Sequence, residues 1–444
     1  GRTKTLPERT DEARFAVVSC SNFPFGYFNA YDHIARRDDV DAVLHLGDYI
    51  YEYGVESYGG KKGASLGRNH FPTHEILTLK DYRQRHAQYK ADPSSQAMHG
   101  AHPLIAIWDD HETANDSWKG GAQNHQSDTE GAWEDRRKAA LQAYYEWMPI
   151  RDPEPGRSRE ALYKAWTWGG LLTLTALETR LMARTKQLEY TEIVPTLKGP
   201  EDIARFERDI LQDPGRYLLG ETQLAYVEKT IKGSVARQEP WRLIANQAMM
   251  AKVVAPNLKP YASEEMITEL EKEWDQARAF VEFSVLGLPL NLDAWDGYPA
   301  ARELLYKRLK GQGASDLVVL TGDSHEFWAN NLNDAQGNRM GVELGTSGVT
   351  SPGPSLYLKD KAFDYSLLLR RENEAVRYHN PLHNGYIHIA LKEDKGIADY
   401  ISVDITQSAQ YQTASVARFT LAKKNGTVEF TQPRGLGIKE RVLF

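Results

Sequence analysis

The chain has one cysteine, no long apolar run and no excess of basic residues. The single cysteine, Cys20, excludes an intramolecular disulfide, so cysteine pairing says nothing about the redox compartment. No stretch reaches the roughly 18 apolar residues that a membrane-spanning helix needs. The formal net charge is −7, so there is no surplus of cations to displace counterions from nucleic-acid phosphates. We therefore expect no transmembrane segment and no nucleic-acid-binding surface.

The rest of the composition is that of an ordinary globular protein. The 444 residues are 41% hydrophobic and 26% charged, which allows a large buried core. Apolar strands alternate with helical segments in the first half, whereas residues 342–430 contain mostly strands of the antiparallel kind. This order predicts an α/β fold with mixed sheets and an antiparallel C-terminal part.

Hydrophobic patterns and end signals predict the main elements. The predicted strands include residues 15–18, 42–46, 104–107, 241–245 and 317–320. The predicted helices include residues 27–36, 133–147 and 299–310, and Thr78 is a cap for a helix that runs to about residue 91. Residues 58–67 are rich in Gly, Lys and Ser and are predicted to form a loop.

Four of the predicted strands end in side chains that bind metal ions. Following the strands in chain order, these side chains are Cys20, Asp48, the run Asp109-Asp110-His111-Glu112, and Asp323 with His325. A buried strand that stops at a turn and delivers a carboxylate into a loop places that acid at the edge of a sheet. Together the four strand ends indicate one polynuclear metal site.

Each motif alone has a simpler explanation. An Asp after a strand is more often a cap than a ligand, and Tyr51 lies in an alternating tyrosine pattern that core packing also explains. Asp323 and His325 fit a buried ion pair equally well. The run 108–112 is harder to explain structurally, because adjacent ionisable groups after a buried strand are costly to desolvate unless they are paired or bound to metal.

Cys20 leaves three interpretations open. Alone it fits a small buried hydrophobe, but its place at a strand end also fits a ligand or a nucleophile that would need a His and an Asn or Asp. Thiolate, phenolate, carboxylate and imidazole together suit a ferric ion, whereas carboxylate and amide oxygens suit Ca²⁺, Mg²⁺ or Mn²⁺.

The motifs above, with Asp293-Ala294-Trp295-Asp296-Gly297-Tyr298, occur in the order found in one known family. From about residue 13 to about residue 430 the chain resembles PhoD-like alkaline phosphatases and phosphodiesterases of the metallophosphoesterase superfamily. The resemblance implies a four-layer αββα sandwich over residues 13–444. It implies that residues 1–12 are a linker, the tail of an N-terminal β-sandwich module that is missing here. It also implies export, and hence a periplasmic or secreted location.

The resemblance also implies a ligand set. The ferric ion would be held by Cys20, Asp48, Tyr51 and His325, with Asp48 bridging toward calcium. Oxygens for the divalent sites would come from Asp110, Asp116 and Asp323, and Mg²⁺, Mn²⁺ or Zn²⁺ are alternatives to calcium there. Asp116 stands where some members have Asn.

The implied activity is the metal-assisted hydrolysis of small-molecule or polymer phosphate esters. The expected catalytic side chains are His111, which would orient the phosphoryl group or protonate the leaving alkoxide, and Tyr51. Glu112 is expected to hold His111 as a second-layer acceptor. The candidate substrate contacts are Arg180, Asn115 and Asn246.

Three alternatives accompany this hypothesis. One is a phosphodiesterase of the phospholipase D type in the same family. Another is a carbohydrate-binding protein without catalysis, suggested by Trp118, Trp133, Trp147, Trp166 and Trp168. The third is a cysteine hydrolase at Cys20, which would act without metal.

Overall fold

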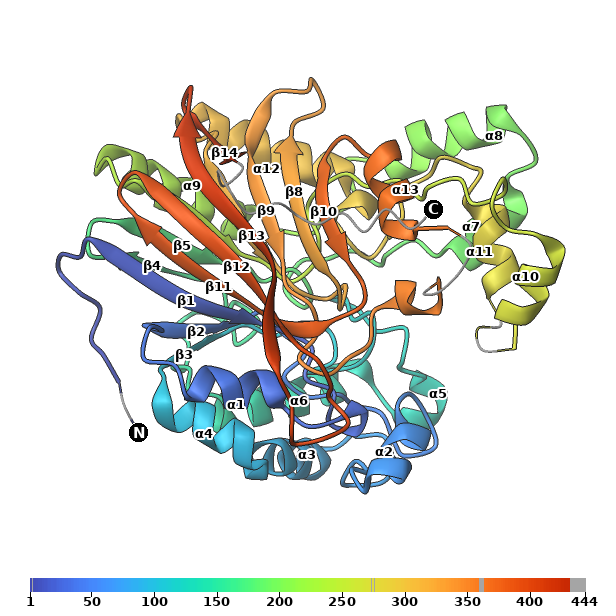
Figure 1. The fold of residues 1–444 in the computed structure, drawn as a ribbon, viewed down its shortest axis with the longest axis horizontal. Helices are drawn as coiled ribbons and strands as arrows, with labels where there is room; N and C mark the ends of the chain where they lie inside the picture. The colour runs from blue at the N-terminus through green and yellow to red at the C-terminus, as the bar shows by residue number, and fades with distance from the viewer. Residues whose placement is uncertain (2, 273, 275, 359–362, 432–444) are drawn as a thin grey trace.

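Two seven-stranded β-sheets lie face to face at the centre of the protein (Figure 1). The structure is a computed structural model that describes residues 1, 3–272, 274, 276–358 and 363–431. Helices cover the outer face of each sheet (Figure 1). The fold is therefore α/β with mixed sheets and helices outside, which confirms the predicted four-layer αββα arrangement.

The first sheet has the strand order β14-β13-β12-β11-β1-β2-β3. β1, β2 and β3 run parallel, whereas β1 pairs antiparallel with β11 and the strands beyond it are antiparallel as well. The antiparallel C-terminal part is thus confirmed. The strands are β1 (Glu12–Val18), β2 (Ala42–His45), β3 (Leu104–Ala106), β11 (Asn384–Lys392), β12 (Lys395–Val403), β13 (Thr413–Lys424) and β14 (Thr427–Thr431).

The second sheet has the strand order β10-β8-β9-β7-β6-β5-β4. Its middle strands β5, β6, β7 and β9 run parallel, and β4, β8 and β10 pair antiparallel with their neighbours. The strands are β4 (Lys164–Trp168), β5 (Leu172–Ala176), β6 (Trp241–Ala245), β7 (Leu317–Thr321), β8 (Phe327–Asn333), β9 (Arg339–Gly345) and β10 (Val376–Asn380).

Three apolar layers hold the four structural layers together, because successive strand residues point to opposite faces. Leu44 and Leu243 pack between the two sheets. Their neighbours face outward, Val43 toward the helices of the first sheet and Ile244 toward those of the second. The helices over the first sheet are α1 (Asn29–Ala35), α3 (Leu79–Ala91), α4 (Pro93–Ala101) and α6 (Trp133–Trp147). Those over the second include α9 (Glu221–Ala236) and α12 (Pro299–Gly311).

Shorter helices lie mostly in the connections. They are α2 (Gly60–Leu66), α5 (Ser127–Glu130), α7 (Tyr190–Ile193), α8 (Pro200–Arg205), α10 (Glu264–Leu270), α11 (Ala277–Phe283) and α13 (Tyr365–Glu372). The group α7, α8, α10 and α11 projects at one end of the molecule (Figure 1). Among the described residues, no helix is both long enough and apolar enough to cross a membrane.

Two of the differences between the predicted elements and the structure concern a loop and two strands. The predicted loop at residues 58–67 contains α2, so that prediction was wrong. Strands β8 and β10 were missed, because their sequences carry polar residues that are not typical of a buried strand. Asn330 in β8 is fully buried and donates to Glu343 of the neighbouring strand at 2.8 Å, so pairing across the sheet stabilises what the local sequence does not indicate.

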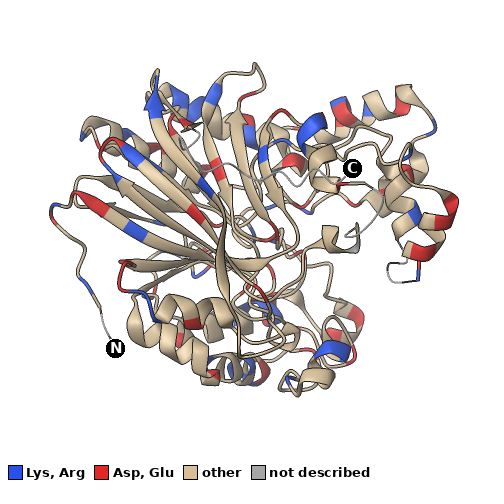
Figure 2. Cartoon of the chain, viewed as in Figure 1, with Lys and Arg blue, Asp and Glu red and all other residues tan. Residues whose placement is uncertain are grey.

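Charged side chains are distributed over the whole molecule. In the view of Figure 2, basic and acidic residues are interspersed over most of the molecule. The segment before β1 is without helix or strand over its described residues, and the amide of Thr10 donates to the carbonyl of Gly169 at 3.1 Å. Its assignment to a preceding module stays a prediction.

Candidate metal centre

The ends of four strands meet at one place between the sheets. Cys20, Asp48 and Asp110 follow β1, β2 and β3 of the first sheet, and Asp323 follows β7 of the second. The loops approach closely: a Cβ on Gly322 would lie 2.7 Å from the side chain of Ser19. Only glycine allows this contact, so the packing of the two sheets brings the predicted ligands together.

The backbone at these strand ends is strained. Among the described residues other than glycine, seven have a positive φ, and five of them are predicted ligands: Cys20 (59°), Asp48 (56°), Asp116 (52°), Asp323 (61°) and His325 (59°). A side chain in this left-handed region costs on the order of 1–3 kcal/mol and persists where surrounding structure enforces it, most often at functional sites. Because this strain lowers the stability of the fold, its concentration in these loops indicates a functional site.

Three groups of donor atoms form within the centre. Their members are Cys20, Asp48 and His325; Asp48, Asp110 and His111; and Asp109, Asp110 and Asp323. In each group the possible ligand atoms all lie within 4.8 Å of one another. Asp48 and Asp110 each belong to two groups, so the three groups form one continuous cluster that can hold metal ions.

Tyr51 joins the first group through its hydroxyl. The oxygen donates to Asp48 Oδ2 at 2.9 Å and lies 3.3 Å from His325 Nε2 and 2.7 Å from Ser351 Oγ. Burial, followed by the charges of Asp48 and Cys20, raises the pKa of this phenol well above its usual value. Tyr51 is therefore not merely packed in the core, as its alternating pattern also allowed.

His325 is held in the form that binds metals. Its Nδ1 lies 2.9 Å from the carbonyl of Pro352, which can only accept, so Nδ1 carries the proton and Nε2 presents its lone pair to the cluster. Burial lowers the pKa of His325 to about 4, which keeps the ring neutral. The ring is oriented as a ligand before any ion arrives.

Several buried carboxylate oxygens have no hydrogen-bond partner among the described residues. They are Asp48 Oδ1, Asp109 Oδ2 and Asp110 Oδ1. Burial raises the pKa of Asp48 and Asp109 well above the usual value for Asp, and neighbouring carboxylates add to the rise at both. Burying unpaired charge of one sign is costly, so the cluster fits cations.

His111 is paired with a carboxylate that was not expected. Its Nδ1 donates to Glu52 Oε2 at 2.7 Å, and its ring stacks on Tyr51 with centroids 4.1 Å apart. Burial lowers the pKa of His111, but Asp110, Glu52 and Asp48 outweigh it and raise that pKa well above the usual value. These neighbouring acids favour the protonated form of the imidazole.

Glu112 does not hold His111, so that expectation was wrong. Its carboxylate instead accepts the backbone amides of Asp48 (3.0 Å), Tyr49 (2.6 Å) and Asp109 (2.8 Å). It ties the loop after β2 to the loop after β3. Glu112 thus supports the position of Asp48 from behind.

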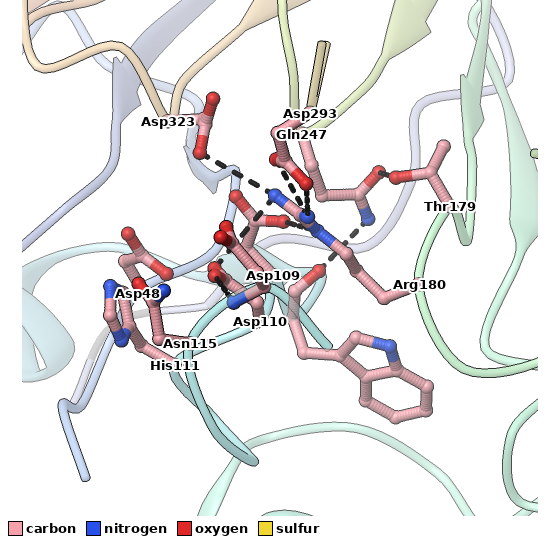
Figure 3. A network of polar contacts seen from close by, with 12 residues as sticks. Asp48, Asp109, Asp110, His111, Asn115, Thr179, Arg180, Gln247, Asp293 and Asp323 are labelled. Carbon is pink, nitrogen blue, oxygen red and sulfur yellow. Dashed lines mark hydrogen bonds and ion pairs between the residues drawn. The ribbon is translucent and has the colours of Figure 1, made fainter. Parts of the chain in front are cut away.

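Arg180 does not face a substrate, contrary to its predicted role. Its side chain is fully buried and its guanidinium lies among four carboxylates (Figure 3). The contacts are an ion pair with Asp109, one with Asp293 at 2.7 Å, one with Asp323 at 3.4 Å and one with Asp110 at 3.8 Å. A guanidinium engaged in this way stabilises the acid cluster and is not available to bind phosphate.

The remaining predicted contacts divide between the cleft and the core. Asn115 lines the cleft and donates to Gln123 at 3.0 Å. Asp116 also lines the cleft, and its backbone amide donates to Asp110 Oδ2 at 2.6 Å. Asn246 is fully buried and its Oδ1 accepts from the indole of Trp295 at 3.2 Å. Because its amide faces inward, the prediction that Asn246 contacts substrate was wrong.

A cleft of about 1260 Å³ opens over the cluster. Asp116, Asp293, Asp323 and His325 line it, so the inner carboxylates are approached from this side. A ligand in the cleft can contact the side chains of Asp323 and His325.

Three residues of the site were missed. Glu52 and Ser351 contact His111 and Tyr51, and Asp293 pairs with Arg180. Asp293 and Glu52 both lay within the motifs used to compare the chain with its family, but nothing in their spacing indicated a role. Ser351 comes from a loop with no pattern of its own.

Comparisons with known proteins agree with this geometry. The sequence model of the PhoD-like phosphatase family matches residues 15–400. Alkaline phosphatase D of Bacillus subtilis (strain 168) is 34% identical over 409 residues, which cover 90% of this chain and 61% of that protein. The chain thus spans less than two thirds of that relative. A solved structure described as "Structure of PhoD" matches with a TM-score of 0.74 and 29% identity, covering 98% of this chain and 75% of the other. The chain belongs to the PhoD-like phosphatase family.

Proposed function

We propose that the protein is a metal-dependent phosphate ester hydrolase with a ferric ion and calcium at the strand-end cluster. The observation that carries the proposal is the continuous cluster of buried donors with unpaired carboxylate oxygens. Membership of the PhoD-like phosphatase family supports the same activity. Hydrolysis of phosphate esters needs concentrated positive charge at the phosphoryl oxygens, which such a cluster is suited to hold.

The donor chemistry favours a ferric ion at one end of the cluster. The proposed ligands there are Cys20, Asp48, Tyr51 and His325. Burial raises the pKa of the Cys20 thiol, and Asp48 adds to the rise, so a strongly charged cation is needed to bind it as a thiolate. Thiolate, phenolate, carboxylate and neutral imidazole together match Fe³⁺.

The other end of the cluster offers only oxygen. The proposed ligands of the divalent ion are Asp48, Asp110, Asp116 and Asp323. Hard carboxylate oxygens suit Ca²⁺, and Mg²⁺, Mn²⁺ or Zn²⁺ are alternatives. Asp109 also belongs to this end of the cluster, but its contact with Arg180 occupies one of its oxygens.

When bound, the cations would draw charge from the phosphoryl oxygens and lower the pKa of water. His111 supplies the proton that the leaving oxygen needs. Glu52 accepts from Nδ1 of His111, which fixes the ring and keeps it charged. The stacking of His111 on Tyr51 sets the plane in which the ring can deliver that proton.

Metal analysis of the purified protein with an activity assay tests the proposal. We expect iron near one per chain, visible absorption from thiolate and phenolate bound to Fe³⁺, and hydrolysis of p-nitrophenyl phosphate. Cys20→Ser and Tyr51→Phe should each change the absorption band, because each removes one proposed donor. A colourless, iron-free and fully active protein would exclude the ferric assignment.

The alternatives differ in what they require of the site. A phosphodiesterase of the phospholipase D type would use the same cluster and is separated by comparing monoester and diester hydrolysis. The five tryptophans offered for carbohydrate binding do not share one surface. Trp118 lines the cleft, Trp166 and Trp168 line a second groove, Trp147 lines a third, and Trp133 is buried. A cysteine hydrolase needs a thiol of low pKa, whereas that of Cys20 is raised. The location proposed for the protein is the periplasm or the cell exterior.

A further inference from the structure

One part of the cleft is apolar, and the proposed metal chemistry does not use it. Phe25 and Tyr58 line this part and lie side by side, and Pro354 and Leu356 also line the cleft. Tyr58 is 38% exposed and Leu356 is 39% exposed, so large apolar side chains face solvent inside the cleft. The cleft of about 1260 Å³ also exceeds the roughly 300–1,000 Å³ of a pocket for a drug-sized ligand. It therefore has room for much more of an ester than its phosphoryl group.

A continuous series of aromatic rings leads from the metal centre to this part of the cleft. The Tyr51 ring stacks on His111 with centroids 4.1 Å apart. The centroid of the Tyr53 ring lies 5.4 Å from that of His111. Tyr53 is 5.5 Å from Tyr58, and Tyr58 is 4.9 Å from Phe25. We call Phe25 and Tyr58 the aromatic wall. A series of ring contacts therefore connects the wall with His111, the proposed proton donor.

Polar side chains line other parts of the cleft, together with apolar ones such as Trp118, Leu188 and Leu290. Asn115, Gln187, Glu189 and Asn291 are among the polar ones. Such groups suit hydroxyls and water, whereas an exposed aromatic face suits a planar ring. The two kinds of lining predict that different parts of an ester bind in different places.

We propose that the aromatic wall is a subsite for an aromatic ring carried by the leaving group of the ester. The inference rests on the proposed function: the phosphoryl group binds at the cluster, and ring contacts run from Tyr51 and His111 of that cluster to the wall, so the leaving group can extend along them. The chemistry recognised is a planar ring attached to the departing alcohol, either an aryl group or a nucleobase. Esters of small polyols lack that ring and gain nothing from the wall.

Kinetics on three monoesters test the subsite. Adenosine 5′-monophosphate carries a nucleobase, phenyl phosphate carries an aryl ring and glycerol phosphate carries neither. In Tyr58→Ala the ratio of kcat/KM for adenosine 5′-monophosphate to that for glycerol phosphate should fall about tenfold, within the range for losing one base–aromatic stack. Most of the change should be in KM, because the ring binds remotely from the reacting atoms.

Matched variants separate stacking from damage to the fold. Tyr58→Phe keeps the ring and should keep the ratio near that of the wild type, whereas Phe25→Leu keeps apolar volume without a π face and should lower it. Tyr217, which is 48% exposed and does not line this cleft, provides the control Tyr217→Ala, which should leave all three substrates unaffected. A fall for one aromatic substrate alone assigns the wall to the nucleobase or to the aryl ring.

Two results in Tyr58→Ala would overturn the subsite. One is that neither aromatic substrate loses kcat/KM relative to glycerol phosphate, and the other is an equal loss on all three substrates. If the wild type hydrolyses none of them, the proposed activity fails separately. The affinity of wild-type and Tyr58→Ala protein for adenosine 5′-monophosphate, measured by calorimetry, then tests whether the wall binds the ring. Equal affinities would exclude this role of the wall.

Discussion

Two histidines of the same cluster differ in the protonation that their surroundings favour, because they contact different acceptors. Nδ1 of His325 lies against a backbone carbonyl, and burial lowers the pKa of His325 to about 4. Nδ1 of His111 lies against the carboxylate of Glu52, and despite burial the surrounding acids raise the pKa of His111. The neutral ring is suited to bind an ion and the charged ring to give a proton.

This contrast predicts different losses for the two alanine variants. His325→Ala should lose both iron and activity, because removing a ligand weakens the whole centre. His111→Ala should retain iron and lose roughly 10²–10⁴-fold in kcat, the range for general acid catalysis. The loss should shrink for esters of p-nitrophenol, whose leaving oxygen needs little protonation. Metal content and kcat over a series of leaving groups measure both effects.

Other results would change the roles. An equal loss over all leaving groups, with iron retained, would mean that His111 positions the phosphoryl group. Loss of iron from His111→Ala would make His111 a ligand or an essential support of one.

Residues that follow a strand directly could be predicted, whereas their supporting partners could not. Asp48, Asp110 and Asp323 stand at strand ends that hydrophobic pattern identifies. Glu112 was expected to hold His111, but Glu52, for which no role was predicted, does so, because sequence neighbourhood does not show which way a carboxylate points once a loop turns. Arg180 was mistaken for a phosphate contact, since only the fold reveals the four carboxylates around it.

At the scale of elements, helices α3 and α4 enclose a lysine without a carboxylate partner among the described residues. Lys90 Nζ lies 2.8 Å from His99 Nε2 and 4.3 Å from the centre of the Tyr49 ring. Burial lowers the pKa of Lys90 to about 7, whereas an unfolded lysine titrates near about 10.4. Between these pH values the unfolded chain holds a proton that the folded chain lacks, so this residue makes stability rise as pH increases.

Lys90→Met should therefore stabilise the protein at pH 7. The gain relative to wild type should shrink as pH rises toward about 10, where the unfolded lysine also loses its charge. Urea unfolding of both proteins across this pH range measures the difference. Lys80→Met, at an exposed position of the same helix, is the control and should show no such trend. A gain from Lys90→Met that is the same at every pH would indicate better packing alone.

Element boundaries were predictable where local signals were strong. β6 and α6 have the predicted bounds, and Thr78 caps α3 in a reciprocal pair with Asp81. β8 was missed because its buried polar side chain depends on Glu343 from another strand. Prediction from sequence is limited by contacts between elements, because the sequence of a single segment does not show them.

At the scale of the molecule, the cluster joins the two sheets. Cys20, Asp48 and Asp110 belong to the first sheet and Asp323 and His325 to the second. An ion that binds ligands from both sheets binds the folded state alone and stabilises it by mass action.

Prolonged chelation should therefore lower both the melting temperature and the activity. Adding Ca²⁺ back should restore part of each, because the carboxylate end of the cluster takes an exchangeable ion. Thermal unfolding and p-nitrophenyl phosphate hydrolysis, measured on the same samples, follow the two effects. Asp323→Asn, which weakens a proposed divalent ligand, should respond less to re-added Ca²⁺ than the wild type. An unchanged melting temperature and full activity after chelation would contradict an exchangeable ion.

The order of the ligands along the chain has a consequence for how the protein matures. Cys20 is synthesised near the start and His325 only after most of the sequence, and they meet only when the two sheets have packed. The proposed iron site would stay incomplete during the early steps of folding, because His325, one of its four proposed ligands, is synthesised late. The identity of the captured ions is then decided by whichever cations surround the protein when folding ends, and not by those present where its synthesis began.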